Sequence, residues 1–161
     1  PSVESQNGLW EDIKARERAQ KGETKLLDGI ARGLPPMLRA LKLQKRAARV
    51  GFDWAEIDQV LDKMTEEAEE LAVELAREKK DQSRIQDEVG DLLFVAINLA
   101  RKAGVDPEIA LQNCNLKFEN RFNYVEEQVV SKHKTFSNVS LDVMEGYWQD
   151  AKAYDRKQTS D

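Results

Sequence analysis

The 161-residue chain has very few of the residue types on which many familiar protein sites depend. It contains one cysteine, Cys114, so an intrachain disulfide and a zinc site built from cysteines are both excluded. It also lacks any run of about 18 consecutive apolar residues and any apolar signal segment near its beginning, which excludes a membrane-spanning protein. We therefore expect a cytoplasmic protein with no membrane partner.

Proline and glycine are scarce as well, with four and eight residues, and runs of β-branched residues are short. Between these few breaks, apolar residues recur at helical spacing. The pattern predicts an all-α fold of one domain, a helix bundle that leaves little sequence for a sheet. The predicted helices cover residues 9–20, 36–49, 54–80, 83–103, 107–130 and 140–154.

The two ends of the chain differ from its middle. Residues 1–25 are polar and carry almost no apolar stripe, and we interpret them as a linker-like polar helix. Residues 26–157 form the predicted domain, and residues 158–161 form a tail. Because the first residue is Pro1 and not methionine, we expect the chain to be a fragment or a processed form of a longer protein.

Two acidic motifs occupy predicted helices at positions that a solvent-facing surface does not explain. They are Glu66-Glu67-Ala68-Glu69-Glu70 and, further along, Glu88-Val89-Gly90-Asp91. On a helical wheel, Glu67 lies within about 40° of Leu71, and Glu88 lies within about 40° of Leu92. Both glutamates therefore lie beside or inside an apolar stripe. Each is followed three residues later by another carboxylate that can converge on the same point.

Carboxylates placed against an apolar core need a compensating charge. Burial without a partner is costly, and two carboxylates about 5 Å apart repel by about 3 kcal/mol at an effective dielectric near 20. Protonation, a cationic side chain or a metal can relieve this repulsion. Ligands that are all oxygen atoms suit a hard cation, Mg²⁺ first and Mn²⁺ second. The candidate metal ligands are Glu67, Glu70, Glu88 and Asp91.

A di-iron bundle is the alternative for carboxylates on paired helices. Such a site would need Glu-x-x-His motifs on two helices. The one histidine of the chain, His133, stands in a predicted loop between two lysines. We therefore exclude a di-iron site.

The acidic motifs and the sequence around them resemble a known family. Glu-Glu-x-x-Glu on one helix, followed by Glu-x-x-Asp on the next, resembles the all-α nucleoside triphosphate pyrophosphohydrolases. The chain is most similar to the MazG family, and in particular to the C-terminal of its two tandem domains. The resemblance covers roughly residues 9–153, and it also rests on residues 44–47, 50–54, 90–94, 98–101 and 117–122.

This resemblance implies a homodimer built from four-helix bundles, and it implies that the N-terminal domain of tandem members is missing here. The implied reaction is the Mg²⁺-dependent hydrolysis of a nucleoside triphosphate such as ATP to the monophosphate and pyrophosphate. Water would attack the α-phosphorus, and the expected role is cleaning of the nucleotide pool. The implied catalytic residues are Glu66, Glu67 and Glu70.

The resemblance also implies a set of residues that contact the nucleotide. These are Lys63, Glu67, Arg84, Asp87, Asp91, Lys117, Arg121 and Trp148. For Arg84, a salt-bridged surface position is an equally good interpretation. Periodicity alone places Trp148 in the core, and we expect Cys114 to be a small core residue.

Two functions of other classes stay open beside the enzyme. The chain has 25 basic and 30 acidic residues, yet residues 29–52 contain no acid and six basic side chains, which could bind nucleic acid without any catalysis. No aromatic residues are interleaved with these charges, and the net charge of −5 also makes nucleic acid the less favoured partner. A purely structural helical domain would leave Glu67 and Glu88 without a purpose, so we favour the enzyme.

Overall fold

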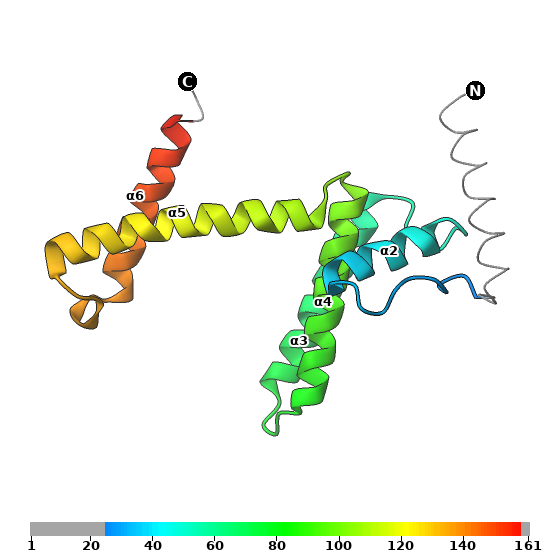
Figure 1. Cartoon of the computed structure of the whole chain (residues 1–161). Helices are drawn as coiled ribbons and strands as arrows, with labels where there is room; N and C mark the ends of the chain where they lie inside the picture. The colour runs from blue at the N-terminus through cyan, green and yellow to red at the C-terminus, as the bar shows by residue number, and fades with distance from the viewer. Residues whose placement is uncertain (1–24, 159–161) are drawn as a thin grey trace, which may run out of the picture. The chain divides into compact units, whose positions relative to one another are not determined.

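The computed structural model describes the backbone of residues 25–158 and the side chains of residues 25–155 (Figure 1). Within these residues it contains five α-helices, one short 3₁₀ helix and no strand, which confirms the predicted all-α fold class. The predicted helix over residues 9–20 lies outside the described residues. The helices are α2 (Pro36–Ala48), α3 (Ile57–Ala76), α4 (Gln82–Lys102), α5 (Pro107–His133), η1 (Phe136–Asn138) and α6 (Leu141–Gln158).

The chain divides into two compact units, with the boundary just after Pro107. In the first unit, α3 and α4 pack side by side as an antiparallel hairpin, and α2 packs on α4 (Figure 1). A small core joins α2 to α4 through Ala40, Leu41 and Ile97. The buried Gln44 of α2 adds a hydrogen bond from its side-chain amide to the backbone carbonyl of Phe94, at 2.8 Å.

The ends of the α3–α4 hairpin follow local capping rules. Helix α3 begins where Glu56 and Gln59 form a capping box, and it ends at Ala76 because the backbone of the next residue, Arg77, is extended. This makes α3 shorter than the predicted span of 54–80. Helix α4 begins where the Asp81 side chain accepts a hydrogen bond from the Ser83 backbone amide. These two ends fix a short turn over residues 77–81.

The second unit consists of α5, η1 and α6. Val125 and Val129 of α5 and Ala151 of α6 are buried in it. Helix α5 runs past its predicted end at residue 130, so His133 is its last residue and does not lie in a loop. The helix stops there because Lys134 adopts a positive φ of 68°. Cys114 is exposed, so its prediction as a core residue is wrong; all of residues 108–120 of α5 are exposed.

None of the helices in the described part of the chain is long and apolar enough to cross a membrane.

Candidate active site

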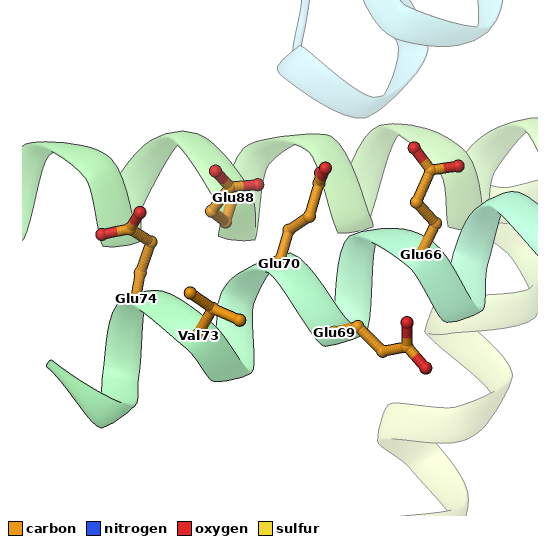
Figure 2. A pocket seen from close by; sticks show the side chains of 6 residues that line it. All are labelled: Glu66, Glu69, Glu70, Val73, Glu74 and Glu88. Carbon is orange, nitrogen blue, oxygen red and sulfur yellow. The ribbon is translucent and has the colours of Figure 1, made fainter.

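A pocket of about 450 Å³, here called the acidic pocket, lies along the α3–α4 hairpin. Figure 2 shows carboxylates of α3 lying beside Glu88 of α4, whereas Glu69 points away from α4. Glu66, Glu70 and Glu74 follow one another at intervals of four residues, so they lie along one face of α3. The residues that line the pocket are Glu66, Glu69, Glu70, Val73, Glu74 and Glu88.

Three of the four predicted metal ligands converge. Glu67, Glu70 and Glu88 each offer a carboxylate oxygen, and these oxygens all lie within 4.8 Å of one another. Glu67 is buried, and its Oε2 atom has no hydrogen-bond partner. A buried carboxylate oxygen without a donor needs a cation or a proton, and oxygen ligands suit a hard divalent cation. The residues at this position therefore fit Mg²⁺ or Mn²⁺.

Lys63 supplies part of the compensating charge. Its Nζ atom lies 2.8 Å from Oε1 of Glu66 and 2.7 Å from Oε1 of Glu67. Hydrogen bonds to Glu66 and then to Glu67 raise the pKa of the Lys63 ammonium well above its usual value. Lys63 was expected to contact the nucleotide, and here it is engaged by two carboxylates of the site. Lys63 binds Oε1 of Glu67 and leaves Oε2 free for a cation.

Glu88 of α4 lies beside several other carboxylates of the acidic pocket, and its pKa is shifted. Partial burial, followed by the charges of Glu70, Glu67, Asp91 and Glu74, raises the pKa of its carboxyl above the usual value of 4.5. Within the described residues, no cationic side chain forms an ion pair with Glu88. Its ionised form is therefore less favourable than that of an isolated glutamate, and a cation bound beside it would offset this cost.

The fourth predicted ligand, Asp91, is not part of this three-carboxylate group. It is exposed and lies one helical turn beyond Glu88 on α4. Its charge nevertheless contributes to the raised pKa of Glu88. The role of Asp91 as a metal ligand stays a prediction.

The other predicted residues of this unit lie on its surface. Arg84 is more than half exposed, and its guanidinium lies 3.5 Å from Glu74 and 4.0 Å from Asp81. This geometry is the salt-bridged arrangement that we weighed against nucleotide binding. Asp87 is exposed on α4.

Three predicted nucleotide-binding residues belong to the second unit. The Arg121 guanidinium donates a hydrogen bond to Asp155 at 2.7 Å and lies 5.9 Å from the centre of the Trp148 ring. Trp148 is half-buried, and its ring also contacts that of Phe118. Lys117 is exposed. Arg121 and Trp148 thus form one local group, and their contact with the nucleotide stays a prediction.

Sequence reasoning missed Glu74. This glutamate is only 6% exposed, lines the acidic pocket and forms ion pairs with Arg77 at 2.8 Å and with Arg84 at 3.5 Å. The signal was present, because Glu74 lies within about 20° of Glu67 on the helical wheel and so falls in the same apolar stripe.

The basic segment over residues 29–52 is partly used by the fold itself. Arg46 donates hydrogen bonds to the backbone carbonyls of Leu26 and Asp28, and this holds the preceding loop against α2. This structural use of Arg46 weakens the argument for a nucleic-acid surface.

The fold and the acidic pocket define a class: an all-α protein with converging carboxylates that fit a hard divalent cation. Residues 56–126 match the family model of the MazG nucleotide pyrophosphohydrolase domain, and the chain therefore carries a MazG domain. This match confirms the resemblance found from the acidic motifs.

Full-length relatives agree with the family match. The chain is 48% identical over 143 residues to the nucleoside triphosphate pyrophosphohydrolase of Escherichia coli K12, which covers 89% of this chain and 54% of that protein. It is 36% identical over 146 residues to the nucleoside triphosphate pyrophosphohydrolase/pyrophosphatase MazG of Thermotoga maritima, with 91% and 55% covered. It is 38% identical over 148 residues to the uncharacterized protein YabN of Bacillus subtilis, with 92% and 30% covered. The chain thus spans about half the length of the first two relatives.

Proposed function

We propose that this chain hydrolyses nucleoside triphosphates to nucleoside monophosphates and pyrophosphate with the help of a divalent cation. The observation that carries the proposal is the convergence of Glu67, Glu70 and Glu88, whose carboxylate oxygens lie within 4.8 Å of one another; Glu67 is buried, and its Oε2 atom lacks a donor. The names of the relatives from Escherichia coli and Thermotoga maritima support the same reaction. Mg²⁺ is the proposed cation and Mn²⁺ its substitute.

The carboxylates of α3 and α4 hold the cation in this proposal. Glu67, Glu70 and Glu88 are its ligands, and Asp91 joins them as the last residue of the second motif. A divalent cation bound there would polarise the phosphoryl group of the substrate and lower the pKa of a water molecule. Without that cation, the acidic pocket repels a polyphosphate chain, so substrate binding and cation binding are coupled.

Water attacks the α-phosphorus, and the bond between the α-phosphorus and the bridging oxygen breaks, so that pyrophosphate leaves. We propose that Glu66 accepts the proton of the attacking water. It lines the acidic pocket but stands outside the group of three converging carboxylates. Lys63, which bridges Glu66 and Glu67, positions this carboxylate relative to the ligands.

Each unit by itself carries proposed nucleotide-binding residues. In the first unit, Arg84 and Asp87 stand near the start of the helix that carries Glu88. In the second unit, Lys117 and Arg121 offer positive charge, and Trp148 offers an aromatic face for the base. We further propose residues 26–157 as the domain and a homodimer as its working form. Cleaning of the nucleotide pool is the proposed role.

A substrate panel tests the proposal. The common NTPs and dNTPs are incubated with the protein and Mg²⁺, and monophosphate, diphosphate, pyrophosphate and orthophosphate are each measured. We expect equal amounts of monophosphate and pyrophosphate, and no turnover in excess chelator. Formation of diphosphate and orthophosphate, or turnover that does not depend on a divalent cation, would contradict the proposal.

A further inference from the structure

The turn between α3 and α4 carries a second charged pocket, of the opposite sign to the first. This cationic pocket has a volume of about 450 Å³. Four of its six lining residues are basic, whereas the acidic pocket contains no basic residue. The residues that line it are Arg77, Lys79, Lys80, Asp81, Gln82 and Arg84.

The two pockets are neighbours on one hairpin and are linked through Glu74. This buried glutamate lines the acidic pocket, and it forms ion pairs with Arg77 and Arg84 of the cationic pocket. Arg77 directly follows α3 and lies seven residues beyond Glu70, which corresponds to about 10 Å along the helix axis. A ligand anchored at the carboxylates can therefore extend toward the turn.

The positive charge of the cationic pocket is available to a ligand. Arg77 and Arg84 are held in place by Glu74 and Asp81, yet both are about half exposed. Lys79 and Lys80 are exposed, and no ion pair within the described residues engages either of them. Lys63, by contrast, is already bound by two carboxylates at the other end of the acidic pocket.

We propose that the cationic pocket binds the pyrophosphate group, first as the two terminal phosphates of the nucleotide and then as the free product. This inference rests on the proposed function, because it assumes that the α-phosphate sits at the carboxylates. The acidic pocket attracts the phosphate chain only through its cation, so the phosphates that extend beyond that cation need cationic side chains. Arg77, Lys79, Lys80 and Arg84 supply them in the direction in which pyrophosphate leaves.

The test uses a double variant and a matched control. Lys79→Ala/Lys80→Ala removes two exposed charges of the cationic pocket. Lys42→Ala/Lys45→Ala removes two exposed charges of α2, so the change in net charge is the same. Binding of inorganic pyrophosphate and of AMP is measured by calorimetry in excess Mg²⁺ for both variants and the parent chain. KM and kcat are measured with the best substrate of the panel.

We expect the Lys79/Lys80 variant to bind pyrophosphate about fivefold to tenfold more weakly and to show a similar rise in KM. Its affinity for AMP, which lacks the terminal phosphates, and all values for the Lys42/Lys45 variant should stay within about twofold of the parent chain. Equal losses for pyrophosphate and AMP, equal losses in both variants, or no loss at all would overturn the proposal.

The outcome also separates this inference from the proposed function. Pyrophosphate binding that depends on Lys79 and Lys80 supports the cationic pocket even if no triphosphate is hydrolysed. Hydrolysis that proceeds with an unchanged KM in the Lys79/Lys80 variant supports the reaction and overturns the cationic pocket.

Discussion

Replacing Glu88 with Gln tests whether the carboxylates serve a cation or the fold. The substitution keeps the shape of the side chain and removes one charge from the acidic pocket. The raised pKa of the Glu88 carboxyl means that its ionised form is less stable in the folded protein than in the unfolded chain. Because no ion pair in the described part of the chain involves Glu88, the substitution leaves no cation without its partner. We therefore expect the melting temperature without metal to be unchanged or higher.

The response to metal gives the magnitude. A cation present at 100 times its Kd stabilises a folded protein by about 2.7 kcal/mol. For a chain of this length, that corresponds to a rise in melting temperature of about 5–10 °C. The Glu88→Gln variant has lost one of three converging ligands, so its rise at the same Mg²⁺ concentration should be less than half of this. Turnover should fall to almost nothing.

Glu74→Gln is the matched control, since Glu74 lines the same pocket but is ion-paired with Arg77 and Arg84. Both arginines are about half exposed, so the loss should be near 1–2 kcal/mol, below the cost of breaking a fully buried pair. Its melting temperature should fall by about 2–8 °C equally in EDTA and in Mg²⁺. Thermal scans in both conditions compare the variants. If Glu88→Gln also destabilises the protein without regard to metal and keeps its activity, the metal site is refuted.

Two further predictions concern the fold and its assembly. Hydrogen bonding to Arg101 lowers the pKa of Asp53, so their contribution to stability is complete above about pH 5 and is lost as the pH falls through the depressed pKa. Asp53→Asn should therefore lower the melting temperature at pH 7 but not near pH 2, and an equal loss at both values would contradict this account of the ion pair. Light scattering at micromolar concentration should give twice the chain mass, and a monomer would contradict the proposed homodimer.

Helical periodicity predicted most of the fold because apolar spacing and helix breakers are local properties of the sequence. The predicted helix over 36–49 is α2 almost to the residue, and the predicted helix over 83–103 differs from α4 by one residue at each end. The predicted helix over 54–80 was too long, because capping by Glu56 and the extended backbone at Arg77 decide where α3 begins and ends. These are details of backbone geometry that periodicity does not contain.

On the helical wheel, Glu67 and Glu88 lie on an inward face, and in the structure Glu67 is buried and Glu88 is half-buried. The wheel did not find the ion pairs of Lys63 and Glu74, because a pattern gives the face of a helix but not the reach of a long side chain. For Cys114, periodicity predicted the wrong environment. It lies on an apolar stripe of α5, yet the stripe is exposed at that point.

The central claim is that water attacks the α-phosphorus at the converging carboxylates of α3 and α4. The most direct measurement is hydrolysis of a nucleoside triphosphate in water enriched in ¹⁸O with Mg²⁺ present, followed by mass spectrometry of both products. Attack at the α-phosphorus places one labelled oxygen in the monophosphate and none in the pyrophosphate, and this is the result we predict. Label in the pyrophosphate would show attack at the β-phosphorus and would contradict the account.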